Sequence, residues 1–111
     1  MQNSLNEERE RIRNQIKMFF KENGITFNED NTHIKVKGEI ENVVILPYAE
    51  ITIRVSETKF LTVEDREGKL ILTYFKAFPE EIKKKLEISK TNLEYILQSI
   101  YYYNNKLVIL F

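Results

Sequence analysis

Residues 59–76, KFLTVEDREGKLILTYFK, decide what kind of fold this chain can adopt. Two runs rich in β-branched and aromatic residues flank the segment Asp65-Arg66-Glu67-Gly68, whose residue types favour a reversal of the chain. We therefore predict an antiparallel hairpin that joins Lys59–Glu64 to Lys69–Lys76.

The alternation with a period of two extends from this hairpin back to Ile25. In residues 33–37, HIKVK, and 50–55, EITIRV, apolar residues alternate with polar ones, which is typical of strands with one wet face. Segments rich in turn-forming residues separate these runs at 29–31, 37–39, 47–48 and 56–58. The sequence therefore predicts an antiparallel β-meander over residues 25–76.

A helix is predicted before the meander. Ser4 and Glu7 have the spacing of a capping box, in which each side chain bonds the backbone amide of the other residue. Asn23-Gly24 is expected to end the helix, because glycine readily adopts the left-handed conformation of a helix C-cap. One stripe at helical spacing is apolar: Leu5, Ile12, Ile16, Phe19 and Phe20.

Two helical segments are predicted after the meander. Pro79 fits the first position of a helix, and the acids Glu80 and Glu81 follow where the helix dipole favours them. Residues 91–94, TNLE, repeat the capping-box spacing and predict a second helix that reaches Asn104. Asn104-Asn105 then suits a tight turn, and Leu107–Phe111 is predicted to be a strand.

The last strand is apolar at every position, so both of its faces must be covered. Such a strand belongs either in the centre of a sheet or across a dimer interface, and we expect a homodimer. The predicted fold class is α+β in a single domain, residues 1–111. It has an N-terminal helix, an antiparallel β-meander, two C-terminal helical segments and a final β-strand, with the helices packed on one face of the sheet.

Composition limits the classes of function. The chain has 111 residues, with seventeen basic side chains against seventeen acidic ones, so no global field attracts nucleic acid or anionic lipid. It contains no cysteine, which excludes a disulfide framework and a Cys-type zinc site. The richness in Ile, Lys and Asn resembles the coding of A/T-rich genomes, so we expect an archaeal or viral source.

No membrane segment is expected, because no apolar run approaches the ~20 residues needed to cross a bilayer. The N-terminal sequence MQNSLNEERERIR is charged where a signal peptide has an apolar segment. We therefore expect a cytoplasmic protein, located in the host cytoplasm if its source is viral.

Glu67-Gly68-Lys69 matches the E-x-K element of a metal-dependent nuclease, with Glu50 or Asp65 as a second ligand. A nuclease places this element on a strand, however, whereas here it lies in a predicted turn. His33 is the only histidine, and no sequence neighbour completes a metal site or a catalytic triad. We therefore expect no enzyme, no catalytic residues, no metal and no cofactor, and the nuclease stays as an alternative.

A nucleic-acid-binding accessory protein is a second alternative. Lys83, Lys84, Lys85 and Lys90 are close in sequence to Tyr101-Tyr102-Tyr103, and cations with aromatic rings are what phosphates and bases require. Glu80, Glu81 and Glu87 offset much of this charge.

Two segments carry a resemblance to a known family. IKMFFKENGITFNED (residues 16–30) and YFKAFPEEIKKKL (residues 74–86) resemble the first helix and the helix after the meander in YbjN-like and type III secretion chaperone-like domains. The resemblance implies a non-enzymatic, often dimeric module that binds protein partners.

We therefore predict a small adaptor or chaperone-like interaction protein, homodimeric, whose partner is another protein. A viral or plasmid-encoded inhibitor of a host defence complex is a further alternative. The predicted interface residues are tyrosines, whose rings are apolar and whose hydroxyls are polar, and residues of the terminal strand. They are Tyr48, Tyr101, Tyr103, Leu107, Ile109 and Phe111.

Overall fold

The computed structural model describes residues 2–45, 48–89 and 99–111. One helix, α1 (Gln2–Glu22), is followed within these residues by nine strands, and every paired neighbour is antiparallel. The predicted α+β class is therefore confirmed. The strands are β1 Asn28–Glu29, β2 His33–Lys37, β3 Glu39–Val44, β4 Ala49–Ser56, β5 Lys59–Arg66, β6 Lys69–Lys76, β7 Ile82–Ser89, β8 Ser99–Tyr103 and β9 Lys106–Leu110.

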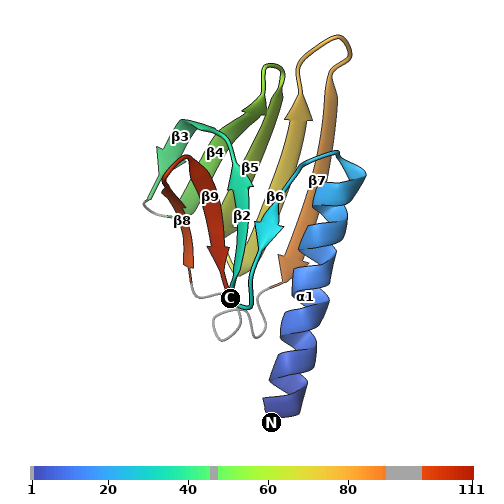
Figure 1. Ribbon diagram of the computed structural model, residues 1–111, viewed down its shortest axis with the longest axis vertical. Helices are drawn as coiled ribbons and strands as arrows, with labels where there is room; N and C mark the ends of the chain where they lie inside the picture. The colour runs from blue at the N-terminus through green and yellow to red at the C-terminus, as the bar shows by residue number, and fades with distance from the viewer. Residues whose placement is uncertain (1, 46–47, 90–98) are drawn as a thin grey trace.

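The strands form two sheets packed face to face (Figure 1). The order is β1-β2-β9-β8 in the four-stranded sheet and β3-β4-β5-β6-β7 in the five-stranded sheet. The predicted hairpin is confirmed as β5–β6, which turns at Glu67-Gly68. The meander prediction holds for β3, β4, β5 and β6 of the five-stranded sheet, whereas β1 and β2 belong to the other sheet, with the C-terminal strands β8 and β9.

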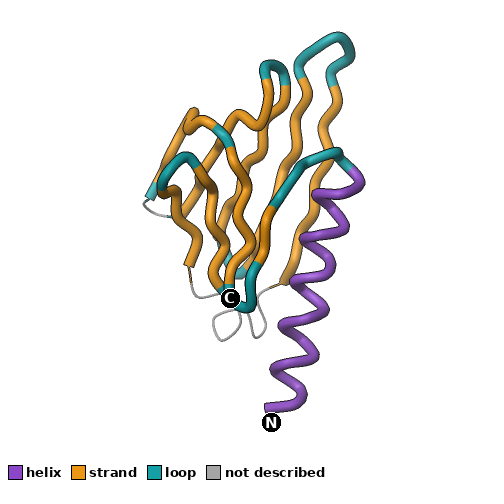
Figure 2. Tube along the Cα trace, in the orientation of Figure 1, coloured by secondary structure: helices purple, strands orange, loops and turns teal. Residues whose placement is uncertain are grey.

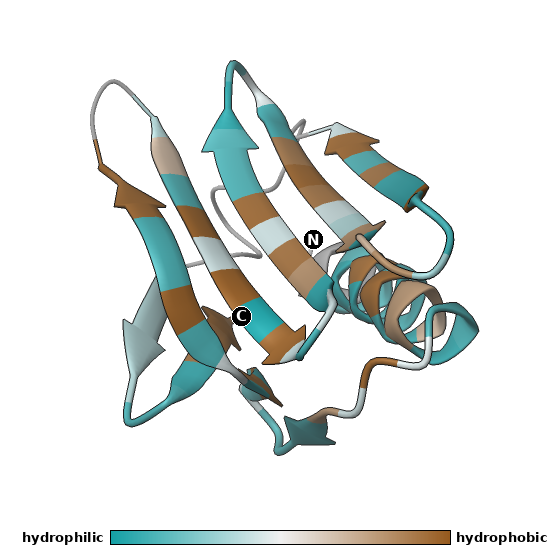
Figure 3. Ribbon diagram, turned by 90° about the horizontal axis from the view of Figure 1, so that it is seen from above, coloured by the Kyte–Doolittle hydropathy of each residue, from teal (hydrophilic) through white to brown (hydrophobic). Residues whose placement is uncertain are grey.

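The helix and the four-stranded sheet lie side by side and cover the same face of the five-stranded sheet, as Figures 1 and 2 show. Seen from above in Figure 3, the five-stranded sheet carries alternating apolar and polar bands, which is the pattern of a sheet with one buried face. Side chains from all three units form one core cluster, with Ile16, Phe20, Ile34, Ile53, Leu61, Leu72, Leu107 and Ile109 among its fully buried members.

The predicted helix stripe is confirmed from Ile12 onward, and the side chains of Ser4 and Leu5 lie outside the described part. The helix ends at Glu22, and Gly24 adopts a φ of 68°. The N–H of Ile25 donates to the carbonyl of Phe20 at 2.8 Å, which closes the last turn.

The terminal strand lies in the centre of its sheet, between β2 and β8. Leu107 and Ile109 face the core, and Val108 on the opposite face is also buried. The N–H of Phe111 donates to the carbonyl of Thr32 at 2.8 Å and anchors the end of the chain. The side chains of Leu107, Val108 and Ile109 are thus buried on both faces of β9 within one chain, without a second copy.

The prediction of C-terminal helices is wrong for the described residues. Ile82–Ser89 is strand β7, paired with β6 along its whole length, and Pro79 lies in the turn before it with a cis bond from Phe78. Ser99–Tyr103 is strand β8, so the second predicted helix does not include these residues. Its earlier part, residues 91–98, lies outside the described residues. The predicted Asn104-Asn105 turn is confirmed, with φ values of 56° and 64°.

Candidate functional site

Exposed apolar side chains gather on one side of the molecule. Among the described residues, five of the seven large hydrophobic side chains that are exposed belong to β3, its end, or β8. They are Ile40, Val43, Ile45, Tyr101 and Tyr103. Strand β3 is the edge of the five-stranded sheet and β8 is the edge of the four-stranded sheet, on the same side in Figure 1.

The four sheet edges are unequal. Strand β1 has only two residues, and β7 displays Lys83, Lys84 and Lys85, so shortness and lysine charge discourage other strands from pairing with them. Strand β3 has six residues, five of them exposed, and carries aliphatic side chains. The main protection of β3 is a bulge between Ile40 and Asn42.

The lysine cluster of the nucleic-acid hypothesis is divided by the strand. Lys83 and Lys85 stand opposite Phe75 and Thr73 on the outer face of the five-stranded sheet, whereas Lys84 stands opposite the buried Tyr74. Lys85 also lies 3.6 Å from a carboxylate oxygen of Glu87. Lys90 lies outside the described residues.

The predicted interface residues fall into two groups. Tyr101 and Tyr103 are exposed, and the ring of Tyr48 is half-buried beneath Arg66, whose Cζ lies 4.4 Å from the ring centroid. Leu107, Ile109 and Phe111 are buried in the chain's own core and offer no surface to a partner. The positions of Leu107, Ile109 and Phe111 therefore do not support the prediction that they contact a partner.

The nuclease element also lies in a turn. Glu67 adopts a φ of 47° at the β5–β6 reversal, and Gly68 follows with a φ of 76°. Glu50 stands directly opposite Glu64 rather than near this turn. Within the described residues, no group of three His, Asp or Glu side chains is placed to hold a metal ion.

Because Glu50 and Glu64 are opposed carboxylates, we expect that removing one of these charges stabilises the protein, and that this gain depends on pH. Burial, and then the charge of Glu64, raise the pKa of Glu50 above its ordinary value. The folded protein therefore binds this proton more readily than the unfolded chain, so the ionised pair costs stability above the folded-state pKa. We expect Glu50→Gln to raise the free energy of unfolding at pH 7 by about 0.5 kcal/mol, the cost of opposed like charges.

That gain should vanish as the pH falls below about 4.3, the pKa of an unfolded glutamate, because the wild-type carboxyl is then protonated as well. Urea unfolding at both pH values tests this. Glu80→Gln, in the exposed β6–β7 turn, is the control and should have little effect at either pH. An equal gain from Glu50→Gln at both values would contradict the role given to charge.

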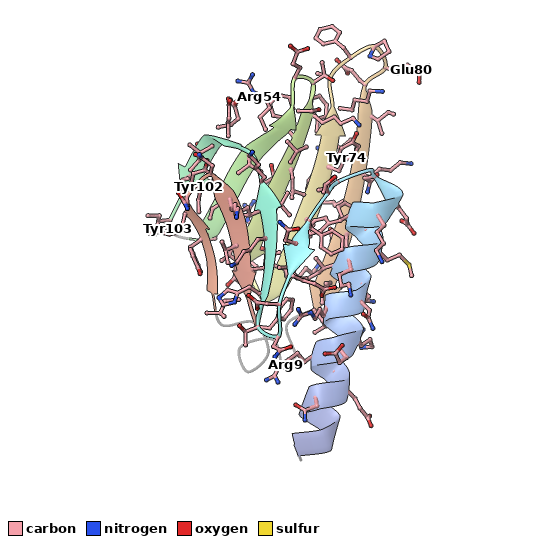
Figure 4. All side chains as sticks on the ribbon, in the orientation of Figure 1. Arg9, Arg54, Tyr74, Glu80, Tyr102 and Tyr103 are labelled. Carbon is pink, nitrogen blue, oxygen red and sulfur yellow. The ribbon has the colours of Figure 1, made fainter. Side chains whose placement is uncertain are left out.

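The outer face of the four-stranded sheet carries tyrosine and lysine side chains. Ile34, Val36, Leu107 and Tyr102 point to the core, so the alternate residues of β2, β9 and β8 point outward. The register places Tyr101, Val108 and Lys35 in one cross-strand row and Tyr103, Lys106 and Lys37 in the next. Figure 4 shows Tyr103 extending away from the body of the protein, while the Tyr102 hydroxyl donates to the carbonyl of Gly38 at 2.9 Å.

One end of this face is fixed by the β1–β2 turn. The backbone N–H groups of Thr32 and His33 each donate to Asp30 Oδ1 at 2.8 Å, and His33 Nδ1 lies 3.1 Å from the same oxygen. These contacts, led by the N–H of Thr32, hold the pKa of Asp30 well below its usual range. Asp30 is thus an ionised turn residue with its own partners.

An open groove of about 740 Å³ lies at the opposite end of the sandwich, where residues 24–28 approach the β4–β5 turn. Four cations and two acids line it: Lys35, Lys37, Arg54, Lys59, Glu39 and Glu57. Arg54 is bound to Glu41 at 2.7 Å, so part of this charge is already compensated.

Comparisons of the chain with protein-family profiles, curated proteins and solved structures found no match. In the part of the chain that the structure describes, α1 is too polar to cross a membrane, and no other helix is present.

Proposed function

We propose that this chain is a small protein-interaction module that self-associates by pairing strand β3 with β3 of a second copy. The observation that carries the proposal is the exposed aliphatic edge formed by Ile40, Val43 and Ile45, here called the β3 edge. These side chains are 44%, 43% and 74% exposed. Pairing two such edges would satisfy the free backbone groups and cover the aliphatic side chains in one step.

The charges on the strand favour an identical partner. Glu41, in the middle of the β3 edge, is bound by Arg54 of the same chain at 2.7 Å. Two copies would therefore not bring unneutralised acids together at the centre of the pairing. A twofold arrangement of identical strands also uses each edge only once and closes the assembly, whereas a heterologous contact can propagate.

The dimer would extend each five-stranded sheet into a continuous sheet with one open face. An adaptor or chaperone-like role, as implied by the resemblance to YbjN-like and type III secretion chaperone-like domains, would use that open face for a further protein. Its central strands display Phe60 and Phe75, whose ring centroids are 6.2 Å apart, beside Thr52 and Thr62.

Light scattering tests the self-association. The purified protein should have twice the 13.3 kDa mass of one chain, and Val43→Lys combined with Ile45→Lys should yield a folded monomer. Lysines on the β3 edge add the charge that already marks β7, and both positions are exposed, so the fold should survive.

Met18→Lys is the matched control, because Met18 is an exposed apolar residue on the outer side of α1, at 61%. This variant should remain a dimer. A monomeric wild-type protein at all accessible concentrations would contradict the proposal. So would a dimer that survives the two β3 lysines.

A further inference from the structure

The outer face of the four-stranded sheet combines aromatic rings with cations. Tyr101 and Tyr103 occupy alternate positions of β8, so both rings lie on the same face at a separation of roughly 7 Å along the strand. Tyr103 is 71% exposed and Tyr101 is 36% exposed. An exposed tyrosine ring has a flat π-surface that any nucleobase can stack on.

Cations stand across the sheet from both tyrosines. Lys106 is directly opposite Tyr103 and Lys37 follows in the same row, while Lys35 occupies the row of Tyr101. Directly opposed residues in antiparallel strands are about 5 Å apart, within the span of one nucleotide. The face therefore presents the rings of Tyr101 and Tyr103 on β8 and the positive charges of Lys106, Lys37 and Lys35 on β9 and β2, with the buried Val108 between Tyr101 and Lys35.

Among the described residues, the positive charge of this face is balanced only at Lys35, which pairs with Asp30. The chain as a whole is neutral, yet none of the outward strand positions described on this face is acidic. Glu29 of β1 points the other way, to Arg13 and Lys17 of α1. Lys37 and Lys106 form no ion pair with any described residue, and the contact of Lys35 with Asp30 is long, at 3.9 Å.

We infer that this face binds single-stranded nucleic acid, with bases stacked on Tyr101 and Tyr103 and phosphates held by Lys35, Lys37 and Lys106. Exposed aromatic side chains on a sheet, flanked by cations, are the elements from which single-strand platforms are built. The tyrosines lie on the same side of the molecule as the β3 edge but on the other sheet, and the inference does not require the proposed dimer.

Single strands fit this face better than duplex. Bases in a duplex are stacked on one another and offer no free surface to the tyrosine rings, so a duplex would gain only the contacts with lysine. The groove adjoining Lys37 adds no net positive charge to this face, because its further cations, Arg54 and Lys59, are matched by Glu39 and Glu57. The contacts that favour a single strand are therefore those of the sheet face itself.

Fluorescence anisotropy with labelled oligonucleotides of about 12 residues tests the inference, using oligo(dT), oligo(U) and a duplex of equal length. At least one of the two single strands should bind more tightly than the duplex. We expect three lysines to contact phosphates, and each such contact contributes about −0.7 to the salt dependence for a single strand. A plot of the logarithm of the binding constant against the logarithm of the salt concentration should therefore have a slope of about −2.

Tyr103→Ala should weaken binding about tenfold, whereas Tyr103→Phe keeps the ring and should bind within about twofold of wild type. Lys37→Ala combined with Lys106→Ala should also weaken binding about tenfold and make the salt slope shallower. The matched control is Lys83→Ala combined with Lys85→Ala, the same loss of charge on the other sheet, which should leave binding unchanged. Circular dichroism confirms that each variant is folded.

Three results would overturn the inference. The first is no binding to any oligonucleotide at low salt, which would leave the tyrosines to a protein partner. The second is an equal loss of affinity from the Lys83 and Lys85 control, which would move the site to β7. The third is tighter binding of duplex than of both single strands, because ring stacking would then have no role.

Discussion

Arg13→Ala is expected to lower the free energy of unfolding by about 3 kcal/mol, because the substitution removes a buried guanidinium and its hydrogen bonds to two carbonyls and a carboxylate. Arg13 is only 6% exposed. Its guanidinium pairs with Glu29 at 3.1 Å and donates to the carbonyls of Asn31, at 2.9 Å, and Asp30. It also lies over the ring of Phe111. One side chain thus joins α1 to the β1–β2 turn and to the end of the chain.

Urea unfolding measures this loss, and Arg13→Lys should restore little of it. A lysine has a single ammonium group and cannot reach two carbonyls and a carboxylate in the plane of a guanidinium. Arg11→Ala is the matched control. Arg11 lies on the exposed side of the same helix and pairs with Glu8 on the surface. We expect that control to change stability by no more than about 0.5 kcal/mol. Equal losses from Arg11→Ala and Arg13→Ala would contradict the structural role of Arg13.

The parts of the fold that the sequence predicts correctly are those with local signals. The stop at Gly24 and the hairpin around Gly68 each depend on a residue whose backbone φ is positive, at 68° and 76°. The stripe that includes Ile16 and Phe20 has a single helical reading, because its residues are three and four apart. The residue types and spacings within each of these segments are enough to indicate the element.

The helix prediction fails at β7 because Ile82 and Leu86 are four residues apart, a spacing that fits both a helix face and one face of a strand. Ile88, two residues after Leu86, fits only the strand and is the signal that could have resolved the choice. Pairing with all of β6 then overrides the helix-start residues at Pro79 and Glu80. Similarly, aromatic residues favour strands, so Tyr101-Tyr102-Tyr103 followed by Asn104-Asn105 indicates the β8–β9 hairpin and not a helix.

The proposed nucleic-acid face has no local signal in the sequence. Sequence proximity pairs Tyr101 and Tyr103 with Lys83, Lys84, Lys85 and Lys90, and not with Lys35 and Lys37. Lys35 and Lys37 reach β8 only because β9 pairs with both β2 and β8, a long-range arrangement with no local signal. The same topology makes the corner between β2 and β3 decisive for the fold.

Gly38 forms that corner, where the chain passes directly from one sheet to the other. A Cβ at this position would lie 2.7 Å from the carbonyl oxygen of Arg54 and 2.9 Å from Ile53 Cδ1. The Gly38 N–H also donates to the carbonyl of Asn105 at 3.0 Å, so the backbone cannot move away without breaking its link to the β8–β9 turn. We expect Gly38→Ala to cost about 2 kcal/mol in urea unfolding, as overpacking against backbone does.

Asparagine substitutions separate this steric cause from a need for left-handed backbone. Gly24 has a φ of 68° and open space around it, so Gly24→Asn should be tolerated, because Asn adopts this conformation readily. Gly38 has no positive φ but no room, so Gly38→Asn should destabilise the protein more than Gly38→Ala does. If Asn were tolerated at Gly38 and not at Gly24, the close approach of the two sheets could not be what requires glycine at the corner.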